Sequence, residues 1–384
     1  MPATMPTHLR RTLDKVRRAV RSRNLWQPGD RLLLGCSGGV DSMVAMALLD
    51  RLAPSLGHDL VVAHIDHGLR DDGHLDADLV RSAATNRGLG FDMQTLELAP
   101  GADLQGRARA GRYQALAAIA EKHKCSRVVT AHNSDDQAET LLMRISRGCG
   151  IDALAGIRSH RDDAVVRPLL TITRADLVAC ARALDVPWRE DPSNQVGRFA
   201  RNRIRHEVLP ALEEVQPGAA AAIARTAENM AAYSESLGHW IRHALASDLR
   251  YDHDDHGNRR ATLPRSSVPV EFGPLAALFW VLANELDAPP PSHRAMEQVH
   301  ATLTSKKANW TGLQVEGLEV SCRADTWTIV RRDVAQVVGA DYPFHSGVAS
   351  AELVVGQQPI DRDDVDQRPI PAQRQHEAVE RSQR

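Results

Sequence analysis

The sequence predicts an α/β protein whose N-terminal part is a parallel sheet with helices on both faces. Two observations lead to this prediction. Short apolar runs alternate with segments of helical periodicity between residues 31 and 147, and polar motifs follow directly after three of the apolar runs. Repeated strand–helix units with buried strands are typical of parallel sheets, whose ligand sites lie outside the carboxyl ends of the strands. We therefore expect the functional residues just after positions 36, 65 and 131.

The individual elements follow from periodicity. Residues 9–20 carry Leu9, Leu13, Val16 and Val20 at helical spacing among arginines, which indicates a short basic amphipathic helix. Apolar runs predict strands over 31–36, 60–65, 91–98 and 127–131. Between them, helices are expected over 43–52, 75–87, 105–124 and 135–147.

The remainder reads as a helical region followed by a small mixed α+β region. We expect a strand over 165–170, helices over 174–184, 200–212, 215–248, 274–287 and 293–304, a polar loop over 252–258, and strands over 313–320 and 326–332. The polar, Pro- and Gln-containing end is expected to be disordered. The predicted division is a basic helix (1–23), a catalytic domain (24–212), a helical then β-containing region (213–333) and a tail (334–384).

Composition excludes several classes of protein. The 384 residues include 47 Lys and Arg against 49 Asp and Glu, so the net charge of −2 does not indicate a surface coated with positive charge. Five cysteines without a CxxC pair argue against a disulfide framework or a zinc ribbon. No apolar run is long enough for a membrane span, and no apolar segment follows the basic N-terminus as in a secretory signal. We expect a cytoplasmic protein without a membrane partner.

The strongest motif is Ser37-Gly38-Gly39-Val40-Asp41-Ser42, between the first strand and the first helix. Glycines let backbone N–H groups approach a phosphate, and the helix N-terminus adds partial positive charge. A carboxylate beside phosphate is repulsive unless a cation lies between them, so Asp41 indicates Mg²⁺. The motif lacks the GK[ST] of a Walker loop. A tight turn with a serine cap is the structural alternative.

Two further clusters follow later strands. His64, Asp66 and His67 stand at the end of the second strand, where they are either metal ligands or ordinary polar groups of a loop. Asp135, Asp136 and Glu139 follow the strand at 127–131. Their i, i+3 and i, i+4 spacings bring like charges together, which is costly unless a cation such as Mg²⁺ or an amine neutralises them. Ordinary acids at a helix N-terminus are the alternative.

Arginines form two candidate anion sites. Arg109 and Arg112 lie one turn apart on the helix over 105–124, where a solvated face is the alternative. Arg198, Arg201, Arg203 and Arg205 fall within eight residues, and Arg201 and Arg205 share one helix face. Guanidinium groups suit phosphate because they donate two hydrogen bonds in a fixed geometry.

Taken in order, these motifs resemble the tRNA(Ile)-lysidine synthetase family of the PP-loop ATP pyrophosphatases. The resemblance covers residues 24–212. Its motifs are SGGVDS at 37–42, DHGLR at 66–70, ARxxRY at 108–113, AHxxDDQAET at 131–140, RGCG at 147–150, RPLL at 167–170, DPSN at 191–194 and RNRIRH at 201–206. The fold it implies is a nucleotide-binding domain of the adenine nucleotide alpha hydrolase type.

The resemblance also implies a reaction. ATP would activate the C2 carbonyl oxygen of the wobble cytidine in tRNA(Ile) with a CAU anticodon, and the amine of L-lysine would attack the adenylated base. Residues 37–42, with His64 and Asp66, would bind the nucleotide, and Asp41 would bind Mg²⁺. Asp136 and Glu139, next to Asp135, would hold lysine, while Arg109, Arg112, Arg201 and Arg205 would contact phosphates of ATP or tRNA. A homodimer is a further expectation.

Three other functions compete with this reading. A PP-loop tRNA thiolase normally needs paired cysteines, and no CxxC occurs in this sequence. An amidotransferase-type synthetase would need a glutaminase partner to supply ammonia. A non-catalytic nucleotide- or RNA-binding module would not need the clustered carboxylates.

Overall fold

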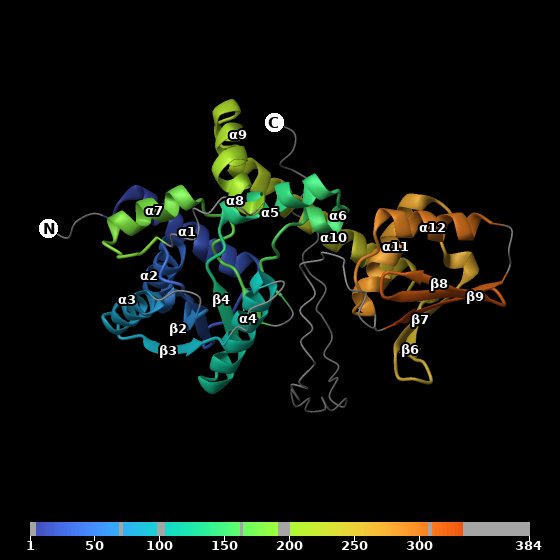
Figure 1. The fold of residues 1–384 in the computed structure, drawn as a ribbon, viewed down its shortest axis with the longest axis horizontal. Helices are drawn as coiled ribbons and strands as arrows, with labels where there is room; N and C mark the ends of the chain where they lie inside the picture. The colour runs from blue at the N-terminus through green and yellow to red at the C-terminus, as the bar shows by residue number, and fades with distance from the viewer. Residues whose placement is uncertain are drawn as a thin grey trace, which may run out of the picture. The chain divides into compact units, whose positions relative to one another are not determined.

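The computed structural model describes residues 5–68, 72–97, 104–161, 164–190, 200–305 and 309–332 of the chain (Figure 1). The predicted tail at 334–384 and the motif residues 69, 70 and 191–199 lie outside these ranges. Among the described helices, none is long and apolar enough to span a membrane. The proposed domain limits stay a prediction.

The N-terminal part is built on a five-stranded parallel sheet. The order is β3-β2-β1-β4-β5, and every neighbouring pair is parallel. The strands are β1 (Arg31–Gly35), β2 (Asp59–Asp66), β3 (Gly90–Thr95), β4 (Arg127–Thr130) and β5 (Val165–Val166). The predicted fold class is confirmed here. The order reverses direction between β1 and β4, which makes that edge the topological switch point where ligands bind in open α/β sheets.

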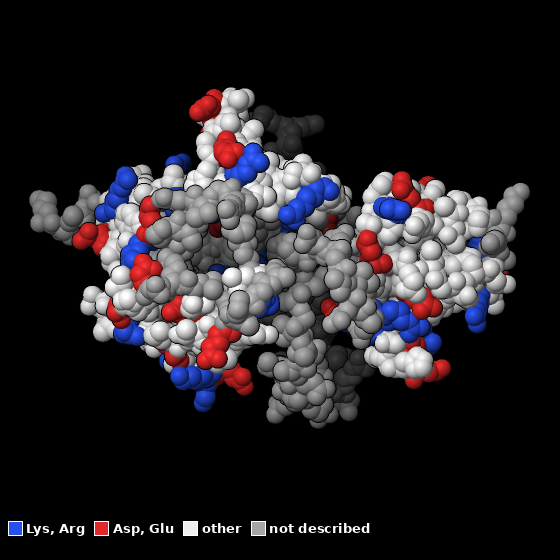
Figure 2. Space-filling model, viewed as in Figure 1, with Lys and Arg blue, Asp and Glu red and all other residues white. Residues whose placement is uncertain are grey.

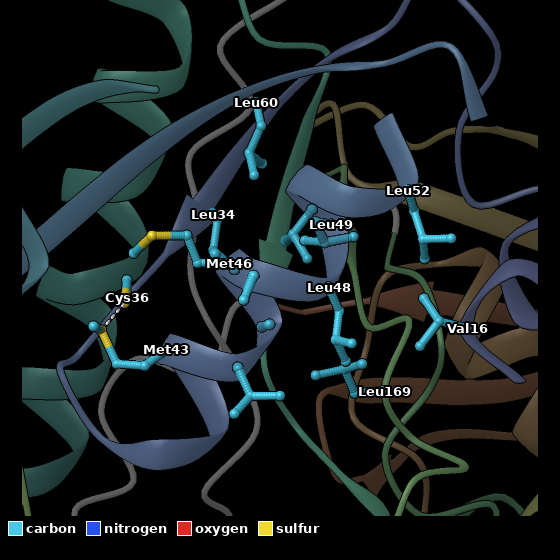
Figure 3. Packing of buried hydrophobic residues seen from close by; sticks show 14 of the residues in the cluster. Val16, Leu34, Cys36, Met43, Met46, Leu48, Leu49, Leu52, Leu60 and Leu169 are labelled. Carbon is cyan, nitrogen blue, oxygen red and sulfur yellow. Dashed lines mark hydrogen bonds between the residues drawn. The ribbon is translucent and has the colours of Figure 1, made fainter. Parts of the chain in front are cut away.

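Alternating strand residues separate the two faces of this sheet. Leu32 and Leu34 pack with helices on one face, whereas Leu33 packs with a helix on the other. The first face is covered by α1 (Thr7–Ser22), α2 (Val40–Leu56), α3 (Gly73–Thr85) and α7 (Arg174–Ala183), and the second by α4 (Leu104–Lys122). Figure 3 shows the first face, where Leu34 and Leu60 of the strands face Met46 and Leu49 of α2.

Helix α1 contributes to this core. The predicted stripe of Leu9, Leu13, Val16 and Val20 is buried, with exposed fractions of 5% or less. Val16 and Leu169 lie near α2 in Figure 3. The apolar face of the basic helix is therefore packed inside the protein, and its arginines lie on the other faces.

A helical region follows the sheet. It contains α5 (Ser134–Arg147), α6 (Ile151–Leu154), α8 (Ala200–Arg203), the π-helix η2 (Ile204–Val208), α9 (Leu209–Val215) and α10 (Ala219–Ala244). The predicted single helix over 200–212 is thus three short segments with a π-helical turn in the middle. Such turns are rare and often occur at functional sites. Helix α5 contacts both α10 and the α8–η2 segment.

The C-terminal described part is a five-stranded antiparallel sheet in the order β6-β7-β10-β9-β8. Its elements are β6 (Arg250–His253), β7 (Arg259–Pro264), the 3-10 helix η3 (Arg265–Ser267), α11 (Phe272–Glu285), α12 (His293–Thr304), β8 (Trp310–Val315), β9 (Leu318–Arg323) and β10 (Thr326–Arg331). Trp327 and Phe279, each 0% exposed, meet edge to face in the core.

Three sequence predictions were wrong in detail. The strand expected over 165–170 is only two residues long, because Pro168 cannot donate to a sheet. The strand expected over 313–320 is a hairpin that turns at Glu316 and Gly317, both with positive φ. The loop expected over 252–258 contains the end of β6, and it is the turn of a β6–β7 hairpin. The exposed residues of β6 concealed a strand, whereas the apolar alternation over 313–320 concealed a turn.

Charged side chains of both signs are interspersed on the face of the molecule that Figure 2 shows. Figure 2 shows basic and acidic groups side by side on the face in view, without a region of a single sign. Arginines that serve anion binding are therefore better identified by their position at the switch point than by surface charge.

Candidate active site

The ATP-loop motif lies at the switch point between β1 and β4. Residues 36–39 connect β1 to α2, and α5 starts four residues after the end of the neighbouring strand β4. Because parallel strands end at the same edge, the SGGVDS loop and the carboxylates of α5 converge on one place. The positions expected from the sequence after residues 36 and 131 are thus combined in one site.

The loop is held by internal hydrogen bonds. The Ser42 hydroxyl accepts from the Ser37 backbone N–H at 3.1 Å and donates to the Gly39 carbonyl at 3.0 Å. Gly38 has φ +87°, and a Cβ there would lie 3.3 Å from the Asp76 Cβ, so both conformation and space favour glycine. Gly39 is the N-cap of α2. A rigid loop leading into a helix N-terminus suits a phosphate group.

Asp41 lies in the first turn of α2 and faces a guanidinium group. Its Oδ2 accepts from Arg174 Nη1 at 2.8 Å, whereas Oδ1 is buried and has no hydrogen-bond partner among the described residues. Burial raises the pKa of Asp41 to about 6, although Arg174 opposes the shift; Asp136 adds to it. A buried carboxylate oxygen without a donor fits a Mg²⁺ ion, which usually takes one or two carboxylates plus substrate phosphates.

The acids of α5 are oriented by a capping box. The Asn133 side chain accepts from the backbone N–H groups of Asp135 and Asp136, and Asp136 Oδ2 accepts from the Asn133 N–H at 3.0 Å. Asp136 Oδ1 is thereby left to point into the site. Asp135 Oδ2 instead accepts from the Arg174 backbone N–H at 2.9 Å.

Asp136 and Glu139 bind two arginines from the α8–η2 segment. Arg201 donates to Glu139 Oε2 at 2.7 Å and to Asp136 Oδ1 at 3.0 Å. Arg205 donates to Glu139 Oε1 at 2.5 Å, to Glu139 Oε2 at 3.0 Å and to Asp136 Oδ1 at 3.3 Å. Glu139 is 1% exposed, so its charge is tolerated only because both oxygens are bonded.

The protonation behaviour of this cluster reflects burial and pairing. Burial raises the pKa of Asp136, although Arg201 opposes this. Burial would lower the pKa of Arg205, but the hydrogen bond and charge of Glu139 outweigh it and raise that pKa. Asp41 also interacts electrostatically with Asp136 and Arg205. The loop carboxylate and the α5 cluster therefore belong to one electrostatic unit.

A second group of arginines surrounds Tyr113 of α4. The guanidinium carbons of Arg109 and Arg112 each lie 5.3 Å from the ring centroid, and that of Arg161 lies 4.9 Å away. Burial opposes ionisation of the Tyr113 hydroxyl, but Arg112, Arg109 and Arg167 outweigh it and lower the pKa to about 8. Positive charge is therefore concentrated around this ring.

His132 connects the two arginine groups electrostatically. It follows β4, and its Nδ1 lies 2.9 Å from the Thr130 hydroxyl. Burial, followed by the charges of Arg167, Arg112, Arg109 and Arg201, lowers the pKa of His132 well below its ordinary value. The imidazole is neutral at physiological pH, as expected for a group surrounded by cations.

Comparison with known proteins assigns the chain to a family. Residues 6–212 match the PP-loop domain family. The tRNA(Ile)-lysidine synthase of Nostoc sp. is 40% identical over 228 residues, which cover 58% of this chain and 66% of the relative. That of Synechococcus sp. is 32% identical over 299 residues, which cover 77% of this chain and 89% of the relative.

The chain belongs to the tRNA(Ile)-lysidine synthase family. Across seven curated relatives of this name, the Nostoc protein included, the match spans between 44% and 68% of the relative's length. The chain thus covers slightly less than half of five of these lysidine synthases and about two thirds of the other two. The U34-tRNA thiolase NcsA from Methanococcus maripaludis shares the fold, with a TM-score of 0.50 and 19% identity over 59% of this chain and 80% of that one.

Most of the predicted site residues meet at the switch point of this lysidine synthase family member. Those brought together are Ser37, Gly38, Gly39, Val40, Asp41, Ser42, Asp135, Asp136, Glu139, Arg201 and Arg205. The described contacts differ from the expected ones in one respect. Arg201 and Arg205, expected on phosphates, bind the two carboxylates expected to hold lysine.

Two residues of the second motif have mainly local contacts. His64 is buried, and its Nδ1 lies 3.0 Å from the Cys36 carbonyl, so it ties β2 to the end of β1. Asp66 Oδ1 accepts from the Gly68 N–H at 2.9 Å. Their proposed role in nucleotide binding stays a prediction. Arg198 and the DPSN motif lie outside the described residues.

Sequence reasoning missed Arg161 and Arg174, and it gave Arg167 no role. Arg167 belongs to the RPLL motif, which was noted only as part of the resemblance. Arg174 follows the capping residue Thr173 at the start of α7. The available signal for Arg174 was its position after β5 at the carboxyl edge of the sheet, but β5 is too short to be recognised from an apolar run.

Proposed function

We propose that this chain ligates L-lysine to C2 of the wobble cytidine in tRNA(Ile) with a CAU anticodon. ATP would adenylate the C2 oxygen with release of pyrophosphate, and the lysine amine would then displace AMP and lose a proton to give lysidine. The observation that supports this most is the single electrostatic unit of Asp41, Asp136, Glu139, Arg201 and Arg205 at the switch point. A ligation that uses the polyanion ATP and the cationic amino acid lysine needs groups of both charge signs in one place.

The residues have separate parts in this proposal. The SGGVDS loop would hold the ATP phosphates through backbone N–H groups, and Asp41 Oδ1 would hold Mg²⁺, whose charge would offset that of the pyrophosphate. Adenylation depends mainly on positioning and on neutralising charge. Arg109 and Arg112, in the group around Tyr113, would contact tRNA or nucleotide phosphates.

Lysine would use the carboxylates of Asp136 and Glu139. Guanidinium groups already hold these oxygens, which supports their capacity to bind a cationic nitrogen donor. An ammonium group would share or replace these hydrogen bonds and free Arg201 or Arg205 for phosphate. The resemblance assigned lysine to the acids and phosphate to the arginines. In this proposal the acids bind the arginines before lysine arrives, and they bind lysine afterwards, when the arginines contact phosphate.

The thiolase remains the second candidate, because the solved NcsA structure has the same fold. That likeness concerns the fold alone. The five cysteines include no CxxC, and they stand far apart in the sequence at 36, 125, 149, 180 and 322. Sulfur transfer through a persulfide or a cluster uses cysteines that are close in space, and a CxxC pair is the usual sequence sign of such a group.

Incorporation of labelled substrate tests the proposal. The full chain is incubated with total tRNA, ATP, Mg²⁺ and either labelled lysine or a labelled sulfur donor. We expect lysine incorporation that depends on ATP and releases one AMP per lysine. Sulfur incorporation would establish the thiolase instead, and ATP-independent retention of tRNA without incorporation would indicate a non-catalytic module. A cytoplasmic location and a homodimer stay predictions.

A further inference from the structure

Arg174 lies outside every motif noted in the sequence, yet it contacts two of them. Its backbone N–H donates to Asp135 Oδ2 at 2.9 Å, and its Nη1 donates to Asp41 Oδ2 at 2.8 Å. The Thr173 side chain caps α7 by accepting from the Asp176 N–H at 3.0 Å, so the backbone of Arg174 is fixed at the start of that helix. One residue thus joins the ATP loop to the N-terminus of α5.

The two carboxylate oxygens of Asp41 have different surroundings. Oδ2 is bonded to Arg174, whereas Oδ1 is buried without a hydrogen-bond partner among the described residues. The Arg174 side chain is 41% exposed, and its Nε and Nη2 have no partner within the same ranges. The guanidinium group therefore holds Oδ2 and leaves Oδ1 for a further cation.

Attachment of α7 does not require this ion pair. Leu177, Cys180 and Ala181, each 0% exposed, pack α7 into the core, and Lys15 of α1 binds Asp176 at 3.1 Å. A pair between partly exposed groups adds little to stability. Its contact with the one loop carboxylate that has an unsatisfied oxygen points to a role in the site rather than in folding.

We propose that Arg174 is a positioning residue that holds Asp41 Oδ2 so that Oδ1 faces the Mg²⁺ accompanying ATP. This inference rests on the proposed ATP-dependent function. It gives Arg174 the part that outer hydrogen-bond partners have at metal sites, where they fix the orientation of a ligating carboxylate.

The test measures how ATP binding depends on Mg²⁺, without turnover. The full chain is titrated with a fluorescent, non-hydrolysable ATP analogue at a series of Mg²⁺ concentrations. We expect Arg174→Met to need about 10–100-fold more Mg²⁺ for half-maximal binding, the range typical for loss of an outer-shell partner. Arg174→Lys should need a Mg²⁺ concentration closer to that of the wild type, because an ammonium group also donates to Oδ2.

Arg182→Met is the matched control. Arg182 lies on the same helix and is exposed, so its loss should leave the Mg²⁺ midpoint unchanged. Circular dichroism and thermal unfolding verify the fold, and Arg174→Gln is the second variant should Arg174→Met not fold. A wild-type Mg²⁺ midpoint in folded Arg174→Met or Arg174→Gln would overturn the inference. Wild-type protein without Mg²⁺-dependent binding would remove the proposed function, and this inference with it.

Discussion

The parallel sheet and the antiparallel sheet each have five strands, but they differ in what is buried beside them. Among the described residues, the buried charged side chains are Asp76, Glu139 and Arg167, all in the parallel-sheet part or the helix that follows β4. In the described residues from 219 onward, the buried polar group is Ser234, and the core of the antiparallel sheet is apolar. Buried charge costs stability unless it is paired, so its concentration in one region indicates function.

Loss of the loop carboxylate should give the largest difference between the regions. We expect Asp41→Asn to lower ATP-to-AMP turnover with tRNA and lysine at least about 100-fold, because it removes the negative charge of the proposed metal ligand. Asp252→Asn is the control, since Asp252 only pairs with Arg260 on an exposed hairpin. Turnover is followed by AMP release. Wild-type turnover in a folded Asp41→Asn variant would contradict the assignment.

Two arginines of similar exposure test how much stability is lost when a buried carboxylate loses its counter-ion. Arg205 is 29% exposed and binds Glu139, which is 1% exposed; Arg260 is 32% exposed and binds Asp252, which is 50% exposed. We expect Arg205→Ala to lower the free energy of unfolding by about 2 kcal/mol, because Glu139 loses a buried counter-ion. Arg260→Ala should cost less than about 1 kcal/mol.

Urea unfolding measures both variants. Equal losses for Arg205→Ala and Arg260→Ala would show that burial of Glu139 does not distinguish the two regions. The same Arg205→Ala protein also tests phosphate contact, since a lost contact makes the salt dependence of tRNA binding shallower. An unchanged slope with reduced stability would assign Arg205 to the carboxylates alone.

The pKa values of two tyrosines, one from each region, give the smallest expected difference between the regions. The arginines around Tyr113 outweigh burial and lower its pKa to about 8. Tyr251 is 46% exposed, and partial desolvation of its ring, followed by the charge of Glu285, raises its pKa to about 12. Between about pH 8 and the ordinary tyrosine value near 10, folded Tyr113 has lost a proton that the unfolded chain still binds. Its contribution to the free energy of unfolding therefore rises with pH in this window.

The ultraviolet absorbance of tyrosinate reports this titration. The wild-type protein should show one tyrosine that ionises near pH 8, and Tyr113→Phe should remove that step while Tyr251→Phe leaves it. A step that survives in Tyr113→Phe would show that the arginines do not act on this ring.

The sequence predicted the parallel sheet and most of the site for a physical reason. Buried strands appear as continuous apolar runs, and their carboxyl ends are known once the strands are known, so Asp41 and Asp136 could be placed at one edge. Contacts between distant segments left no such pattern. Neither the pairing of Arg205 with Glu139 nor that of Arg174 with Asp41 follows from spacing, since the partners are 66 and 133 residues apart.

The antiparallel part was predicted less accurately for the opposite reason. Its edge strand β6 is exposed at every residue, so it reads as a polar loop. The turn at Glu316 and Gly317 has only one glycine and lies between residues that continue the apolar alternation. The positions of exposed strands and short turns depend on pairing with distant strands, and the local sequence predicts such pairing poorly.

Lysine binding in the presence of nucleotide tests most directly whether the loop, the carboxylates and the arginines form one site. Labelled lysine is equilibrated with the full chain, with and without Mg²⁺ and a non-hydrolysable ATP analogue, in wild type and Glu139→Gln. We expect the nucleotide to tighten lysine binding at least about fivefold, with the reciprocal effect of lysine on the nucleotide, and Glu139→Gln to bind lysine much more weakly. Lysine binding that ignores both the nucleotide and the Glu139→Gln change would contradict a single site.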